Sequence, residues 1–110
     1  MNMTLNDFQT KARRTALYPS QYGLIYTTLG LSGESGELAE KAKKMLRDDN
    51  GVLTDTRRNA MKKELGDVLW YVASLATELN ASLQEIAEIN INKLTSRKER
   101  GVIQGSGDNR

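Results

Sequence analysis

Two pairs of carboxylates, each with its members three residues apart, most constrain how this sequence can fold. The first pair is Glu34 and Glu37, and the second, about thirty residues further along, is Glu64 and Asp67. Side chains three residues apart lie one turn apart on the same side of an α-helix. Each pair therefore predicts a helix that presents both of its carboxylates on one side.

Apolar residues at helical spacing accompany both pairs and predict that the two helices pack together. One stripe lies in a helix from about Tyr22 to Arg47, with Glu34 at its edge. The other lies in a helix over about residues 54–79, with Glu64 at its edge. Packing of the stripes would bring all four carboxylates to one border of the seam. The stripe positions are Leu24, Leu31, Leu38, Ala42 and Met45 in the first helix, and Met61, Val68, Val72, Leu75 and Leu79 in the second.

Four carboxylates at one border are costly unless something positive lies among them. Two unit charges about 6 Å apart repel by roughly 2 to 3 kcal/mol at an effective dielectric near 20. Lys41, four residues after Glu37, and Lys63, four residues before Asp67, can neutralise part of this charge. A solvated charged face is the simpler interpretation, but a bound divalent cation also accounts for the two carboxylates that have no such lysine.

The residue types in the chain restrict which metal this site could hold. The sequence has no histidine and no cysteine, which excludes the usual zinc ligands and the Glu-x-x-His motifs of di-iron bundles. Oxygen ligands alone suit Mg²⁺, with Mn²⁺ as a substitute. The sequence therefore predicts a magnesium site.

Shorter helices are predicted on both sides of the two long ones. Thr4 and Asp7 form the pattern of a capping box, which predicts a first helix ending near Leu17, before a break at Pro19. Ser82 begins a second capping box that opens the last helix.

Turn residues separate the long helices from each other and from the last helix. Residues 48–51 and Asn80 favour helix stops, while Gly30 allows a kink in the first long helix. We therefore expect an all-α fold: a four-helix bundle with two long antiparallel metal-binding helices and shorter N- and C-terminal helices.

Composition indicates one small domain. With 110 residues, 38% of them hydrophobic, and a single proline, we expect one domain over residues 1–110, with its core over about 5–101 and a flexible tail over 102–110. A chain of this length buries only about two-thirds of its unfolded surface, which favours association with copies of itself.

Charge and hydropathy argue against several classes of partner. The net charge is only +2, with one basic cluster near the C-terminus, whereas nucleic-acid binding usually needs a broader basic stripe. The chain has no charged-then-apolar leader at its N-terminus and no apolar run of about 18 residues, and it contains no cysteine. We expect a cytoplasmic protein that contacts no membrane.

The two carboxylate pairs and the sequence around them resemble the MazG-like all-α nucleoside triphosphate pyrophosphohydrolases. The resemblance covers about residues 24–101 and includes the segments 31–40 and 63–71, followed by 90–94 with Arg97 and Gly101. It implies Mg²⁺-dependent hydrolysis of a nucleoside triphosphate to the monophosphate and pyrophosphate, for house-cleaning or control of the nucleotide pool. It also implies a homodimer or homotetramer whose sites lie near subunit contacts.

The candidate site residues follow from the matching positions. Glu34, Glu37, Glu64 and Asp67 are the expected metal ligands, and one of them is the expected base, since the chain has no histidine.

Other candidates would bind the substrate. Tyr71, one turn after Asp67, could border the nucleoside; Lys93 and Arg97 could contact the phosphates, and Asn90 the sugar or base. A solvated basic face is an alternative for the last three. We expect Trp70 to lie in the core or at a subunit interface rather than to stack on the base of the nucleotide.

Two other functions remain open from the sequence. One is a non-enzymatic helical module that associates through its leucine stripes, and the other is a nucleotide- or metal-binding regulator without turnover. Divalent-ion dependence of pyrophosphate release separates the enzyme from both.

Overall fold

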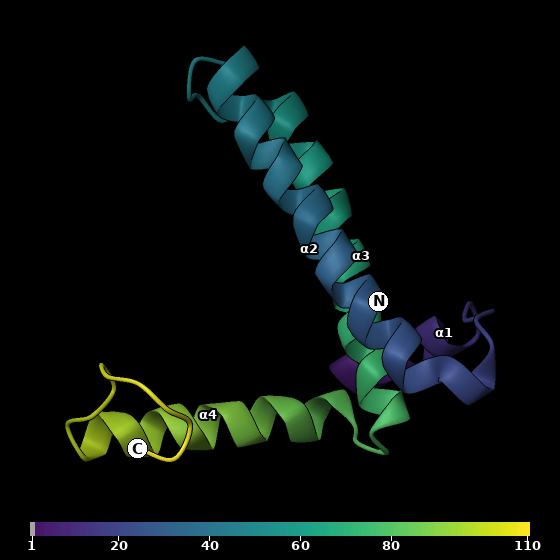
Figure 1. Ribbon diagram of the computed structural model, residues 1–110, viewed down its shortest axis with the longest axis vertical. Helices are drawn as coiled ribbons and strands as arrows, with labels where there is room; N and C mark the ends of the chain where they lie inside the picture. The colour runs from purple at the N-terminus through teal and green to yellow at the C-terminus, as the bar shows by residue number, and fades with distance from the viewer. Residues whose placement is uncertain (1) are drawn as a thin grey trace.

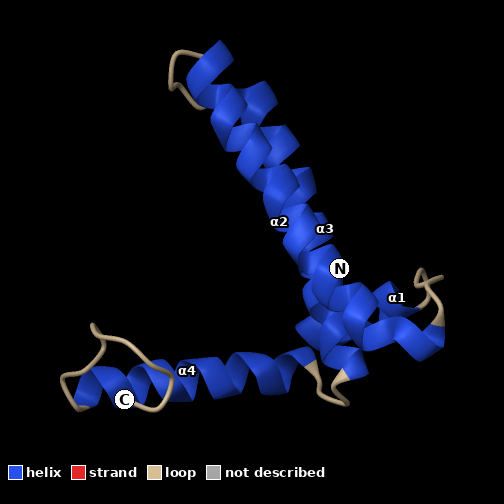
Figure 2. Ribbon diagram, in the orientation of Figure 1, coloured by secondary structure: helices blue, strands red, loops and turns tan. Residues whose placement is uncertain are grey.

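A computed structural model describes residues 2–110, and the regular structure in this range is entirely helical (Figure 2). The predicted all-α class with four helices is confirmed. A single turn of 3-10 helix, Ser20–Tyr22, precedes the second helix. The four α-helices are α1 (Leu5–Arg13), α2 (Gly23–Asp48), α3 (Asp55–Glu78) and α4 (Leu83–Glu99).

The long helices α2 and α3 form an antiparallel pair that dominates the shape of the molecule (Figure 1). Helix α1 packs against α3 at the base of this pair, and α4 contacts α1 and α3 at the same end. From there α4 points away from the pair, so the chain has two arms that meet at the base (Figure 1). This geometry separates the residues on the far half of α4 from the middle of α2 and α3.

Helix α1 begins as predicted but ends earlier. The Thr4 hydroxyl accepts from the Asp7 amide at 3.0 Å, and the Asp7 carboxylate accepts from the Thr4 amide at 3.0 Å, so the capping box is present. The predicted end near Leu17 was wrong, because α1 stops at Arg13. The Thr15 hydroxyl donates to the Ala12 carbonyl at 2.8 Å, and this bond gives the backbone an alternative to another helical turn.

The turns after α2 and α3 use the residues expected from the sequence. Asn50 and Gly51 both have positive φ (54° and 75°), and the Gly51 amide donates back to the Met45 carbonyl at 3.1 Å. Asn80 also has positive φ (56°), while Thr54 and Ser82 cap the following helices.

Helix α2 is continuous through its glycines, and Gly30 has a clear packing role. A side chain at Gly30 would collide with the ring of Tyr71 on α3. Gly33 and Gly36, by contrast, face open space. Gly30 therefore allows close contact between the two long helices beside the Tyr71 ring.

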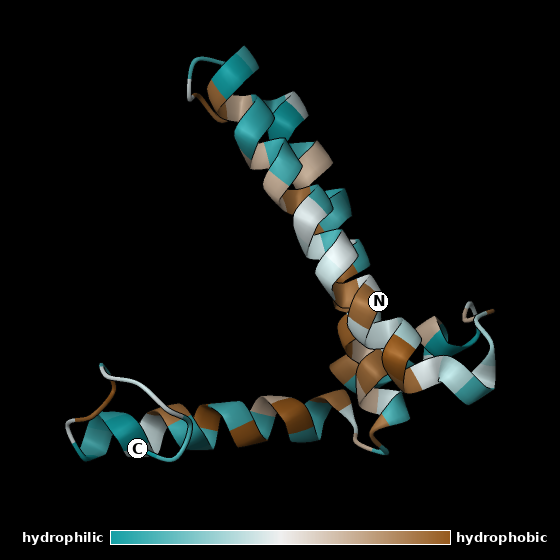
Figure 3. Ribbon diagram, viewed as in Figure 1, coloured by the Kyte–Doolittle hydropathy of each residue, from teal (hydrophilic) through white to brown (hydrophobic). Residues whose placement is uncertain are grey.

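The buried core is small and lies at the base, where hydrophobic colouring is concentrated (Figure 3). Its buried apolar members are Ala12, Ala73, Ala76 and Leu83, with Phe8 and Trp70 among the partly buried residues packed against them. Among residues 2–110, no helix has both the length and the apolar character needed to cross a membrane.

The single chain is expanded and exposes more surface than a compact protein of its size. Its radius of gyration is 16.8 Å, whereas a compact chain of this length has about 13 Å. Its accessible surface is 7967 Å², against about 6,100 Å² expected for a compact monomer of this mass. The excess is roughly 1,900 Å².

Candidate metal centre

Carboxylates from α2 and α3 meet near the middle of the long pair. One oxygen from each of Glu34, Glu64 and Asp67 can be chosen so that all three lie within 4.8 Å of one another. Glu34 and Glu64 are half-buried, and Asp67 is exposed. The structure thus brings together three of the four carboxylates singled out in the sequence. Glu37 is exposed and lies outside this group.

The crowded carboxylates perturb the titration of Glu34. Burial raises its pKa first, and the negative charges of Asp67, Glu64 and Glu37 raise it further. The folded chain therefore binds this proton more tightly than the unfolded chain does. The resulting stabilisation is present at acid pH and is lost as the pH rises through the raised pKa, so at neutral pH the ionised form of Glu34 works against folding.

Lys41 offers the cluster only a distant positive partner. Its ammonium lies 3.8 Å from Glu64 Oε1, across the seam between α2 and α3. The spacing of four residues predicts Lys41 as a partner for Glu37 on its own helix. Since Lys41 is half-buried in the seam, it reaches α3 instead.

These residues suit a divalent cation with oxygen ligands. Three carboxylates within 4.8 Å provide the hard, negatively charged oxygens that Mg²⁺ and Mn²⁺ prefer. A cation would also relieve the repulsion that raises the pKa of Glu34.

Aromatic side chains lie on the base side of the carboxylates. The ring of Tyr71 is 6.4 Å from that of Tyr26 and 4.9 Å from that of Trp70. Burial, a hydrogen bond with Tyr26 and the charges of Glu34 and Asp67 raise the pKa of Tyr71. Tyr71 therefore borders the acidic cluster, and its place beside the nucleoside stays a prediction.

Tyr26 and Tyr18 were missed by the sequence analysis. Their rings stack with centroids 5.0 Å apart, and the Tyr18 hydroxyl donates to Glu78 Oε1 at 2.7 Å. Burial and the bond to Glu78 raise the pKa of Tyr18 to about 12. One feature of the sequence could have indicated Tyr26. It lies four residues before Gly30, on the same side of α2, and Gly30 is the residue against which the Tyr71 ring packs.

Trp70 packs against the base of the molecule, in agreement with the core interpretation. It is one of the partly buried residues around the core, and its indole Nε1 donates to the Thr15 hydroxyl at 2.7 Å.

The candidate substrate residues of α4 lie away from the carboxylates of the same chain. Asn90 is exposed, and the helix that carries it diverges from α2 and α3 (Figure 1). Lys93 and Arg97 share one side of α4, as predicted, because both contact Asp108.

Asp108 places a carboxylate directly on these two cations. The Lys93 ammonium donates to Asp108 Oδ1 at 3.2 Å, and Arg97 Nη2 donates to Asp108 O at 2.8 Å and to Oδ1 at 3.3 Å. Arg97 is only 4% exposed, and its buried Nε has no partner among the described residues. The chain therefore already shows that Lys93 and Arg97 can hold one anion together.

The C-terminal tail reaches α4 by folding back on itself. Gly101, Gly105 and Gly107 have positive φ (72°, 138° and 86°), which glycine adopts without strain. Arg110 then donates to the carbonyls of residues 102, 103 and 107. The flexibility predicted for the tail stays a prediction, and no local pattern in the sequence indicates these contacts.

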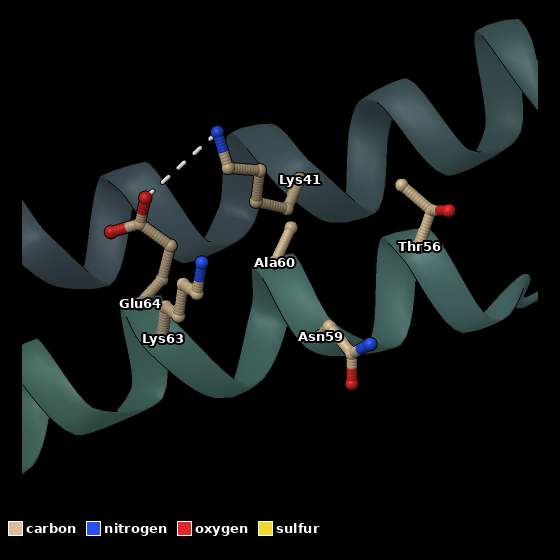
Figure 4. Close-up of a pocket in the computed structure, with 6 residues that line it drawn as sticks. All are labelled: Lys41, Thr56, Asn59, Ala60, Lys63 and Glu64. Carbon is tan, nitrogen blue, oxygen red and sulfur yellow. Dashed lines mark ion pairs between the residues drawn. The ribbon is translucent and has the colours of Figure 1, made fainter.

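A polar groove adjoins the acidic cluster on the side of the α2–α3 loop. It has a volume of about 470 Å³ and contains Glu64 at one end (Figure 4). Its other lining residues are Lys41, Thr56, Asn59, Ala60 and Lys63.

Comparison with known proteins identifies relatives of this sequence. The family described as MazG nucleotide pyrophosphohydrolase domain matches residues 24–102, a range that includes the acidic cluster and α4. The Gene 37 protein of Mycobacterium phage L5 is 53% identical over 114 residues, covering 98% of this chain and 100% of that protein. No solved structure matches the chain.

Proposed function

The chain belongs to the MazG nucleotide pyrophosphohydrolase family, and we propose that it is a Mg²⁺-dependent enzyme that hydrolyses nucleoside triphosphates to monophosphates and pyrophosphate. The observation that carries this proposal is the convergence of Glu34, Glu64 and Asp67 from two helices, with oxygens within 4.8 Å. Such an enzyme would serve house-cleaning or control of the nucleotide pool in the cytoplasm.

The acidic cluster supplies the proposed metal ligands. Glu34, Glu64 and Asp67 would hold the cation, and Glu37, one turn along α2, is the proposed fourth ligand. When bound, Mg²⁺ neutralises phosphate oxygens and lowers the pKa of water, and Mn²⁺ is a possible substitute.

The chain's own residues would orient the reactants and accept a proton. One of the carboxylates takes the proton from water as the water oxygen bonds to phosphorus. The bond from that phosphorus to the oxygen that bridges the α- and β-phosphorus breaks, and this oxygen leaves with the other phosphorus, so that a monophosphate and pyrophosphate separate. Attack on either the α- or the β-phosphorus gives the same products.

Tyr71 is the proposed border of the nucleoside site. It lies beside the carboxylates, and its ring is supported by Tyr26 and Trp70. An aromatic surface of this kind can stack on any base.

The α4 residues are proposed to complete the site of a second copy. Asn90, Lys93 and Arg97 would contact the substrate, with the two cations on its phosphates. Since α4 points away from its own α2–α3 pair (Figure 1), a symmetric homodimer, alone or within a homotetramer, allows α4 of one copy to reach the carboxylates of another.

Exposed apolar surface supports this assembly and predicts its size in solution. The excess of roughly 1,900 Å² per chain exceeds the surface of about 800 Å² that each partner buries in a standard interface. Leu65, which is 56% exposed, and Leu69 line an apolar groove on α3. Sedimentation equilibrium at micromolar concentration should therefore give a mass of at least about twice the 12.3 kDa of one chain.

A matched pair of leucine variants tests the interface. Leu65→Lys should shift the protein toward monomer, whereas Leu46→Lys, at the exposed tip of the long pair, should not. A wild-type monomer that hydrolyses nucleotides at a normal rate would contradict the shared site.

The contacts of Asp108 with Lys93 and Arg97 lead us to expect that its carboxylate competes with the substrate phosphates for these two cations. A phosphate can bind these cations only after the Asp108 carboxylate leaves them. Since this carboxylate is 83% exposed, solvent screens its attraction to the two cations and the contact is weak. Asp108→Asn should therefore lower KM about 1.5- to 5-fold in steady-state kinetics, while Asn109→Ala should leave KM unchanged. An unchanged KM for Asp108→Asn would show that the Asp108 carboxylate does not compete with the substrate.

The function itself is tested by a product screen. The standard ribo- and deoxyribonucleoside triphosphates are incubated with the protein, with and without Mg²⁺, and the products are identified. We expect a monophosphate and pyrophosphate to form only with the metal. If no nucleotide yields them, a helical association module or a regulator without turnover replaces the enzyme.

A further inference from the structure

We propose that the groove containing Lys41 and Lys63 binds the pyrophosphate end of the nucleoside triphosphate, so that the nucleoside end lies toward Tyr26 and Tyr71. The inference rests on the proposed function and adds a subsite and a direction of substrate binding along the long helices.

The groove has the chemistry of a phosphate site. Figure 4 shows Lys41 on α2 and Lys63 on α3, both on the side of the groove next to Glu64. Ammonium groups are effective point charges for phosphate, and Thr56 and Asn59 add a hydroxyl and an amide further along. The small side chain of Ala60 lies between the helices and leaves room. A volume of about 470 Å³ is within the range of small-molecule sites.

Both lysines retain capacity to bind an anion. Lys41 lies 3.8 Å from Glu64, which is beyond normal hydrogen-bond length, so its three donors are not consumed by that contact. Within residues 2–110, the Lys63 ammonium forms no ion pair. Two cations facing one groove from different helices repel each other, and an anion between them removes that repulsion.

The order of residues along α2 sets the direction of the substrate. Tyr26, Glu34 and Lys41 follow one another at intervals of about 12 Å and about 10 Å, at 1.5 Å per residue. On α3 the order is the same in space, because Tyr71 lies on one side of the carboxylates and Lys63 on the other. The carboxylates therefore lie between an aromatic end and a cationic end.

A nucleoside triphosphate has matching ends. Its base can stack on aromatic rings, while its terminal phosphates carry most of its negative charge. In this direction the lysines also lie beside the two terminal phosphates and neutralise their charge, whichever of the α- and β-phosphorus atoms water attacks. The opposite direction would place the terminal phosphates against tyrosines and leave two lysines without an anion.

Calorimetric binding of the two products tests the subsite directly. Pyrophosphate and the standard nucleoside monophosphates are titrated separately, in the presence of Mg²⁺, into the wild type, Lys63→Gln and Lys41→Gln. Lys43→Gln is the matched control, because it makes the same charge change on α2 at an exposed position that pairs with Glu40 and lies outside the lining of the groove. Far-UV circular dichroism verifies that each variant is helical.

Each outcome bears on the proposal. We expect Lys63→Gln and Lys41→Gln to raise the pyrophosphate Kd about 10- to 100-fold, the scale of a lost charge-assisted contact, with monophosphate Kd values within about twofold. Lys43→Gln should match the wild type. Unchanged pyrophosphate Kd values in both groove variants, or no pyrophosphate binding by the wild type, overturn the subsite. If the two groove variants weaken monophosphate binding and leave pyrophosphate binding unchanged, the nucleoside end of the substrate lies in the groove, and the proposed direction is wrong.

The calorimetric titrations and the product screen together distinguish this inference from the proposed function. If pyrophosphate binds through the two lysines but no nucleotide is hydrolysed, the hydrolase proposal fails and the anion site stands. If nucleotides are hydrolysed but the groove variants bind pyrophosphate normally, the subsite fails and the hydrolase proposal stands.

Discussion

Glu34→Gln and Glu64→Gln are expected to reduce Mg²⁺-dependent hydrolysis by more than about 100-fold while the helical fold is retained. Loss of residues that only support metal ligands typically costs 10- to 100-fold, so loss of a ligand should cost more. Both side chains contribute to the group whose oxygens lie within 4.8 Å. Steady-state kinetics over a range of Mg²⁺ concentrations measures the loss.

Thermal stability in the absence of metal should move in the other direction for Glu34→Gln. The raised pKa of Glu34 shows that its ionised form is disfavoured in the folded chain. Removing that charge at neutral pH should keep or raise Tm, and the difference should narrow as acid protonates the wild-type carboxyl. Glu64→Gln should gain less, because it also loses the contact with Lys41.

Glu40→Gln is the matched control on the same helix. Glu40 is exposed and pairs with Lys43 at 2.9 Å, outside the acidic cluster. Its loss should leave activity within about twofold, since exposed ion pairs contribute little. Full activity in Glu34→Gln or Glu64→Gln would exclude the metal centre, whereas unfolding of either would point to a structural role.

Local sequence patterns predicted the helices well because their signals lie within a few residues. The capping box at Thr4, the cap at Ser82 and the left-handed stop at Asn80 are all present. Each depends on contacts between near neighbours, which a single sequence contains. The end of α1 was less predictable, since Thr15 has a partner 55 residues away, where it accepts from Trp70.

The acidic site was partly predictable for the same reason. Helical periodicity placed each carboxylate pair on one side of its helix, and the apolar stripes indicated that the two sides would meet. The periodicity could not specify rotamers, so it did not separate Glu37 from the three carboxylates that converge. Nor could it show that Lys41 reaches across the seam to Glu64.

Long-range arrangement was the least predictable part. The direction of α4 depends on its contacts with α1 and α3 at the base, and the sequence carries no local signal for that angle. The tail contacts of Asp108 depend on several glycines with positive φ acting together. Consequently, the sequence identified Lys93 and Arg97 as cations on one side of a helix but not the anion that they bind.

Lys93→Ala is expected to lower kcat/KM by roughly 30- to 150-fold, which corresponds to about 2 to 3 kcal/mol. In the proposed dimer Lys93 contacts the phosphates, and its charge stabilises the transition state as the phosphoryl group transfers. If it were only a surface lysine, its loss would change kcat/KM by less than about twofold. Steady-state kinetics at saturating Mg²⁺ and fixed ionic strength measures the difference, with Lys98→Ala, on the exposed end of α4, as the control.

Co-expression of Lys93→Ala with Glu64→Gln tests whether the site is shared between copies. In a symmetric dimer, a mixed pair would contain one site with both changes and one site with neither. Random assembly makes about half of the dimers mixed, so about a quarter of wild-type activity should return, although each variant alone is nearly inactive. A site formed within one chain gives no such recovery, because every site then keeps one of the two changes. If mixed dimers are verified by mass spectrometry and no activity returns, Lys93 is a surface residue that does not contribute to the site of another copy. The acidic cluster would then act without α4.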